Sequence, residues 1–164
     1  MKFKLKIEYI FLSLLVIFTS SIFYFAFGEK QDNYLKVAFL DVGQGDAIYI
    51  EAPNGRQMLI DGGPDQKVLA KLAEVMPFGD RSIDLVVATH TDADHVGGLP
   101  SILENYQVSM ILENGGTSKT KIYQALEDEI KTKNIKKEIA RYGLKIMLDD
   151  EKNLVWNETI KLSD

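Results

Sequence analysis

The chain has 164 residues, of which 46% are hydrophobic and 26% charged, and this composition excludes low-complexity disorder as its main state. It contains no cysteine, so disulfide bonds and thiolate metal ligands are excluded and a metal ion would need histidines and carboxylates. Lys2, Lys4, Lys6 and Glu8 precede Gly28, and the residues after it carry sixteen basic and twenty-three acidic side chains. That net charge of −7 excludes binding of polyanions by overall electrostatics, so a nucleic-acid partner would require metal ions or a local positive patch.

The chain begins with an uncharged apolar run over Tyr9–Phe27. A helix of these nineteen residues, at about 1.5 Å each, approaches the ~30 Å hydrocarbon thickness of a bilayer. Lysines precede the run and acidic residues follow it, so the positive-inside rule predicts that the N-terminus is cytoplasmic and that the globular part lies outside. The predicted segments are a cytoplasmic N-terminus at 1–6, a transmembrane signal anchor at 7–28, a linker at 29–33 and an extracytoplasmic domain at 34–164. We therefore expect a single-pass protein of the cell membrane. The alternative is a signal peptide that is cleaved to release a secreted domain.

The globular part opens with three predicted strands, Leu35–Leu40, Ala47–Glu51 and Gln57–Ile60. The turn-forming sequence Pro-Asn-Gly at 53–55 separates the last two, which predicts a hairpin. Asp-Gly-Gly at 61–63 then ends the third strand abruptly.

Helices and strands alternate in the remainder of the chain. The predicted helices are Gln66–Met76, Val96–Tyr106 and Thr120–Lys131, and the predicted strands are Ile83–Ala88, Val108–Leu112, Ile139–Leu148 and Leu154–Leu162. The charged run Lys131–Lys137 is interpreted as a solvated surface. Three adjacent strands followed by this alternation predict a layered α/β (α+β) fold with a mixed sheet.

Four side chains able to bind a metal, His90, Asp92, Asp94 and His95, lie within six residues directly after the buried strand Ile83–Ala88. Ligand sites of open α/β sheets lie at the carboxyl ends of their strands. A tight loop there can place His90 and Asp92 on one ion, and Asp94 and His95 on a neighbouring ion. Imidazole and carboxylate ligands suit Zn²⁺, Mn²⁺ or Fe²⁺. The alternative is a polar turn in which Asp92 or Asp94 only caps a helix, but this leaves the clustering of the two histidines unexplained.

Three linked motifs now resemble a known family. The pattern His-x-Asp-x-Asp-His-x-Gly-Gly at 90–98 resembles the metal motif of the metallo-β-lactamase superfamily. Leu-Asp-Val-Gly-Gln-Gly-Asp-Ala at 40–47 and Leu-Ile-Asp-Gly-Gly at 59–63 narrow the resemblance to the extracytoplasmic domain of ComEC-type DNA-uptake competence proteins and their free-standing relatives. It covers about residues 34–164 and implies the first half of an αββα sandwich, preceded by one transmembrane helix.

The resemblance implies two divalent metal ions, zinc or manganese, in a complete domain. His90 and Asp92 would help to bind the first ion, and Asp94 and His95 the second. Asp94 would also orient the attacking water, which makes it the expected catalytic residue.

Two further acidic residues are implied to lie behind the metal ligands. Asp61 would steady the metal loop, and its alternative reading is an ordinary β-turn residue. Asp46, with Gly43 and Gly45, would form a tight loop beside the site, and a backbone bend that glycine permits is the alternative there.

The resemblance implies a metal-dependent hydrolase that acts on a phosphodiester or nucleic-acid substrate outside the membrane, although the superfamily's other substrates remain open. The alternative is a catalytically inactive, membrane-anchored fragment. A complete domain has later histidine and aspartate ligands, whereas no histidine follows His95. We therefore expect an incomplete metal site and a sheet with one face uncovered.

Overall fold

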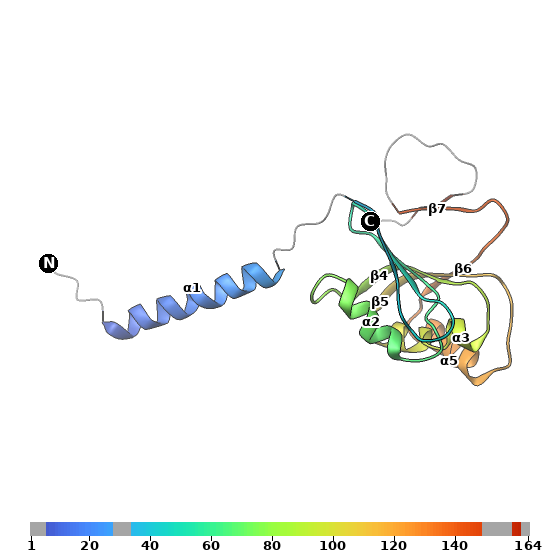
Figure 1. Cartoon of the computed structure of the whole chain (residues 1–164), viewed down its shortest axis with the longest axis horizontal. Helices are drawn as coiled ribbons and strands as arrows, with labels where there is room; N and C mark the ends of the chain where they lie inside the picture. Colours follow the sequence, from blue (N-terminus) through green and yellow to red (C-terminus); the bar gives the residue numbers. More distant parts are fainter. Residues whose placement is uncertain (1–5, 28–33, 149–158, 162–164) are drawn as a thin grey trace. The chain divides into compact units, whose positions relative to one another are not determined.

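The structure is a computed structural model that describes residues 6–27, 34–148 and 159–161. It contains an apolar N-terminal helix and a separate α/β unit (Figure 1). The predicted linker at 29–33 and most of the predicted strand Leu154–Leu162 lie outside the described residues.

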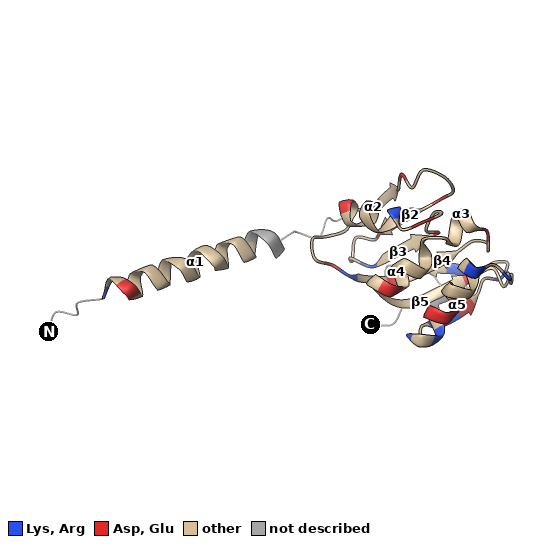
Figure 2. Cartoon of the chain, turned by 90° about the horizontal axis from the view of Figure 1, so that it is seen from below, with Lys and Arg blue, Asp and Glu red and all other residues tan. Residues whose placement is uncertain are grey.

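The first unit is helix α1, Ile7–Phe27. Its window Ile7–Tyr24 has a mean hydropathy of 1.8, so α1 is long and apolar enough to cross a membrane, as an anchor or a signal sequence would be. Figure 2 shows acidic colour only in its first turn. The hydroxyls of Ser13 and Thr19 donate to main-chain carbonyls of the preceding turn at 2.8 and 3.0 Å, which satisfies these polar groups within the helix.

The α/β unit is built on a six-stranded sheet in the order β1-β2-β3-β4-β5-β6. Its strands are β1 Lys36–Phe39, β2 Ile48–Glu51, β3 Gln57–Ile60, β4 Ser82–Ala88, β5 Gln107–Glu113 and β6 Lys136–Ile139. The pairs β1–β2 and β2–β3 are antiparallel, and the pairs from β3 to β6 are parallel. The predicted mixed sheet is therefore confirmed.

Strands β4, β5 and β6 are each reached by a helical crossover. The helices are α2 Lys67–Val75, α3 Ala93–Val96, α4 Leu99–Asn105 and α5 Lys121–Thr132. They cover one face of the sheet, where fully buried residues such as Leu72, Ile102 and Leu126 pack against strand residues such as Leu59 and Ile111. This face holds the larger of the two hydrophobic clusters and fixes the strand ends that carry the site.

The opposite face carries a smaller cluster. Met58, Leu85, Met110 and Leu112 are buried there against the segment 144–148, which includes strand β7, Lys145–Met147. A short strand β8, Thr159–Lys161, pairs with β7 in parallel. The face expected to be uncovered is thus covered at its centre. It is exposed at the β1 edge, where the exposed fractions of Val37 and Phe39 are 46% and 79%.

Three predicted elements differ from the structure. The helix expected over Val96–Tyr106 is two helices, α3 and α4, which are separated at Gly97–Gly98. The strand expected over Ile139–Leu148 is interrupted by a turn between β6 and β7. The charged run Lys131–Lys137 differs only in part: five of its seven residues are exposed, as expected of a solvated surface, but it continues into β6 and Lys137 pairs with the buried Glu113.

Candidate metal centre

The carboxyl ends of β3 and β4 lie side by side and bring Asp61 next to the loop that starts at Thr89. Ile60 pairs with Val87 in the parallel register, and the Asp61 main-chain N–H donates to the Val87 carbonyl at 2.8 Å. The site therefore lies where ligands bind in open α/β sheets, at the ends of parallel strands.

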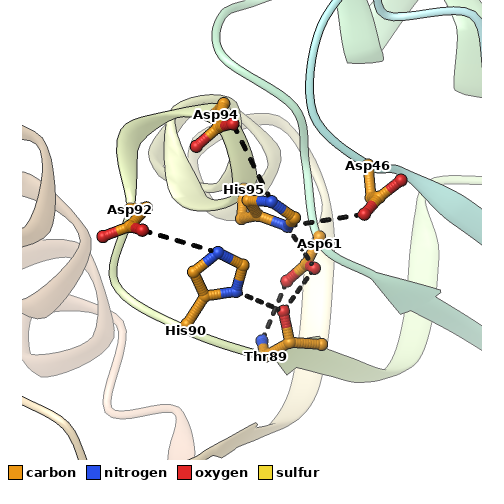
Figure 3. A network of polar contacts seen from close by, with 7 residues as sticks. All are labelled: Asp46, Asp61, Thr89, His90, Asp92, Asp94 and His95. Atoms are coloured by element: carbon orange, nitrogen blue, oxygen red, sulfur yellow. Dashed lines mark hydrogen bonds and ion pairs between the residues drawn. The ribbon is translucent and has the colours of Figure 1, made fainter.

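Asp61 holds the segment 89–95 through its side-chain hydrogen bonds. Only 2% of it is exposed, and its φ of 58° lies in the left-handed region, which Asp tolerates better than most residues. Its Oδ1 accepts a hydrogen bond from the Thr89 N–H at 2.8 Å. Its Oδ2 accepts one from the Thr89 hydroxyl at 2.5 Å and lies 2.8 Å from Nδ1 of His95 (Figure 3). Asp61 is therefore more than a turn residue, since its carboxylate joins three groups of the metal loop.

These contacts select which nitrogen of each imidazole carries the proton when the ring is neutral. An ionised Asp61 only accepts hydrogen bonds, so Nδ1–H of His95 donates to it and Nε2 carries the free lone pair. The Thr89 hydroxyl donates its one hydrogen bond to Asp61, so Nδ1–H of His90 donates to the Thr89 oxygen at 2.9 Å. In the neutral form both rings therefore present an unprotonated Nε2, which is the form that binds a metal ion.

Each Nε2 atom faces a carboxylate of the same loop. Asp92 Oδ2 lies 3.7 Å from His90 Nε2, and Asp94 Oδ2 lies 3.9 Å from His95 Nε2. The two imidazole centroids are 3.7 Å apart. Ligands that each lie about 2.0–2.2 Å from one ion are separated by roughly 3–4 Å, so these nitrogen–oxygen pairs fit shared coordination.

Asp61, His90 and His95 each offer a ligand atom within 4.8 Å of the others, so they also meet the distance requirement for a metal site. The Asp61 carboxylate, however, already accepts bonds from Thr89 and His95 and is almost fully buried. Its position behind the rings suits orientation of the imidazoles better than direct ligation.

Asp46 approaches the site from the loop between β1 and β2. Its Oδ2 lies 3.9 Å from His95 Nδ1, which is beyond hydrogen-bonding distance. The loop passes so close to α3 that a Cβ on Gly45 would lie 1.7 Å from the Asp94 carbonyl oxygen. Only glycine fits there. The loop therefore combines the two features expected of it, a backbone bend that requires glycine and a position beside the candidate site.

The capping alternative for the acidic pair is not supported by the geometry. Asp92 occupies the N-cap position of α3, but its side chain accepts no capping hydrogen bond. The six residues singled out from the sequence lie together, with Asp46 at the margin (Figure 3). Sequence reasoning missed Thr89, for which the one available signal was a hydroxyl directly before the first histidine.

Comparisons with known proteins agree with the motif pattern. Residues 40–119 match the family model of the metallo-beta-lactamase superfamily. The chain is 29% identical over 115 residues to ComE operon protein 3 of Bacillus subtilis, which covers 57% of this chain and 15% of that protein. It is 37% identical over 62 residues to Beta-lactamase-like protein 2 homolog of Drosophila melanogaster, which covers 37% of this chain and 21% of that protein. The chain thus spans about a fifth or less of the length of these relatives.

Proposed function

This chain belongs to the metallo-beta-lactamase superfamily, and from that premise we propose that its α/β unit is a metal-dependent hydrolase domain acting on phosphodiester bonds outside the cell membrane. One observation carries the proposal. The Nδ1 atoms of both imidazoles are engaged by Thr89 and Asp61, so that both Nε2 atoms are turned towards the carboxylates of Asp92 and Asp94.

In this proposal His90 and Asp92 hold one divalent ion, and Asp94 and His95 hold a second. Such ions, zinc or manganese, supply a water of lowered pKa and stabilise developing negative charge. Asp94 orients the attacking water from its place in the first turn of α3. Asp61 orients the His95 imidazole directly and the His90 imidazole through Thr89, as residues behind metal ligands commonly do.

The phosphodiester substrate is supported by the similarity to ComE operon protein 3 and by the motif at 40–47. The fold alone does not select it, because the superfamily's architecture hosts other hydrolytic reactions. Since the part after Gly28 is acidic overall, the affinity for a nucleic acid has to come from bound ions and local cations.

We further propose that α1 anchors the chain in the membrane with the α/β unit outside. The support is an uncharged helical run with lysines at its N-terminal end. Carbonate extraction tests this proposal, because an anchored chain stays with the membrane pellet. Release of the full-length chain, or a mature N-terminus beyond Phe27, would favour the secreted alternative.

The second candidate is a membrane-anchored protein without catalytic activity. It is favoured by the histidine count, since the chain has two histidines and both lie in the short segment 90–95. Two protein ligands per ion are fewer than the three or four usual for zinc. The gene sequence after the codon for Asp164 separates the candidates. An in-frame continuation with histidine motifs supports the hydrolase, and a stop codon supports the inactive protein.

The direct test uses the full chain in detergent with Mn²⁺ or Zn²⁺. Metal binding is followed by competition titration, and turnover is measured on bis(p-nitrophenyl) phosphate and on single-stranded DNA. We expect weak metal binding that the double change His90→Ala with His95→Ala abolishes, and little turnover unless further ligands are supplied. Tight binding that survives the double change would place the metal elsewhere and refute the proposed site.

A further inference from the structure

A lysine lies against the loop that borders the candidate site. This glycine loop, residues 43–46, contacts α3 through Gly45 and approaches His95 through Asp46. At its other end, a Cβ built on Gly43 would lie 3.6 Å from Nζ of Lys67, the first residue of α2. The lysine is therefore separated from the metal loop by the width of one short loop.

The charge of Lys67 is not neutralised by a neighbouring carboxylate. Its side chain is exposed, and within the described part of the chain its ammonium takes part in no ion pair. Lys71, one turn further along the same helix, shows the contrast, because its ammonium lies 3.0 Å from the Glu74 carboxylate. Lys67 thus offers an uncompensated positive charge at the edge of an acidic site.

The glycine loop offers hydrogen-bond donors at the same place. Gly43 and Gly45 have φ values of 90° and 72°, and within the described part of the chain the main-chain N–H groups of 43–45 donate to no acceptor. Successive N–H groups in such turns favour anions. Taken together, the ammonium and the loop form a small positive patch in an otherwise acidic surrounding.

We propose that Lys67 binds a phosphate group of the substrate next to the one being hydrolysed, and so selects polyanionic substrates such as single-stranded nucleic acid. This inference rests on the proposed function and deepens it. Carboxylates surround the site, so a substrate with several phosphates is repelled wherever no ion offsets them. Lys67 supplies the local positive patch that the acidic composition of the chain requires.

Binding of a fluorescein-labelled single-stranded oligodeoxynucleotide to the full chain in detergent, with Mn²⁺ present, tests the inference by fluorescence anisotropy. Lys67→Gln removes the charge, and Lys71→Gln is the matched control on the same helix. We expect Lys67→Gln to weaken binding about tenfold, as for the loss of one charge-assisted hydrogen bond. The slope of log affinity against log salt should fall by about 0.7, as for one phosphate contact on a single strand. Lys71→Gln should leave both unchanged.

A methylphosphonate oligonucleotide of the same sequence, which lacks the backbone charge, should bind the Lys67→Gln variant and the unchanged chain alike. Equal loss of DNA affinity in both variants would indicate diffuse electrostatics and overturn the inference. Metal-dependent DNA binding that is unaffected by Lys67→Gln would overturn it while leaving the proposed function intact. No DNA binding by the unchanged chain would overturn the proposed phosphodiester substrate, and this inference with it.

Discussion

Replacing Lys137 by Met should destabilise the α/β unit strongly. Glu113 is 3% exposed, and its Oε2 lies 2.7 Å from the Lys137 ammonium, which also binds Glu127. Burial opposes the charged form of Lys137, but hydrogen bonds to the two carboxylates outweigh it and raise its pKa above the usual range. Without the ammonium, Glu113 becomes a buried charge with no counter-charge, and removing one partner of a buried pair costs about 3–5 kcal/mol.

Urea unfolding of the full chain in detergent, followed by far-UV circular dichroism, measures this loss. The lower end, about 3 kcal/mol, is expected because Lys137 is itself partly exposed, and it should lower the urea midpoint by at least about 1 M. Lys136→Met is the matched control, since Lys136 pairs with Glu138 at the surface at 3.4 Å and its removal should cost less than about 1 kcal/mol. Adding Glu113→Leu to Lys137→Met should restore most of the stability, because the buried charge is then absent. Equal midpoints for the two single lysine variants would refute the reasoning.

Three further predictions concern pH and the site. Burial opposes ionisation of Glu127, but its hydrogen bond to Lys137 outweighs this and lowers the pKa of Glu127 below 4.5. The contribution of Glu127 to the free energy of unfolding is therefore present above pH 4.5 and is lost as the pH falls through the lower pKa of the folded state. The urea midpoint should consequently depend less on acid pH in Glu127→Gln. Thr89→Val removes the hydroxyl that orients one imidazole and should weaken Mn²⁺ or Zn²⁺ binding about 10–100-fold in competition titrations, whereas a similar loss in Thr89→Ser would contradict this role. Gly45→Ala should abolish metal binding, because its Cβ forces the glycine loop away from α3. Gly143→Ala is the control, since Gly143 has a similar positive φ but no atom within 4 Å of an added Cβ, and it should reduce only local stability. Equal metal affinity in the two variants would argue against the close approach.

The strands and the clustering of the candidate ligands could be predicted from the sequence because each has a local cause. The third strand was predicted with its observed ends, since a turn motif precedes it and an Asp-Gly-Gly sequence ends it. The two histidines lie within one loop, and a chain segment that short cannot separate them. The predicted mixed sheet also follows from local connections, because short turns join antiparallel strands and helices join parallel ones.

The errors arose where tertiary contacts override local pattern. Apolar periodicity continues across Gly97–Gly98, but the Gly98 N–H donates to the Gly63 carbonyl at 3.0 Å, so a bond to the loop after β3 replaces one within the helix. The strand β6 is rich in charge and resembles a solvated segment, yet edge strands tolerate charged residues, and Lys137 is needed by the distant Glu113. The role of Thr89 depends on Asp61, which lies on another strand.

The loops around the histidines are joined by main-chain bonds: Gly62 N–H donates to the His95 carbonyl at 2.7 Å, Gly63 N–H to Asp46 at 2.9 Å and Gly98 N–H to Gly63 at 3.0 Å. These bonds link segments far apart in the sequence, so they form only after the β3–α2–β4 crossover has closed, a step with a high entropic cost. An unfolded chain therefore lacks the arrangement of ligands that the proposed metal site requires, and an isolated peptide of residues 89–98 would not reproduce it. At the proposed site, metal loading would accordingly follow folding, and the ion acquired would depend on the compartment in which folding ends.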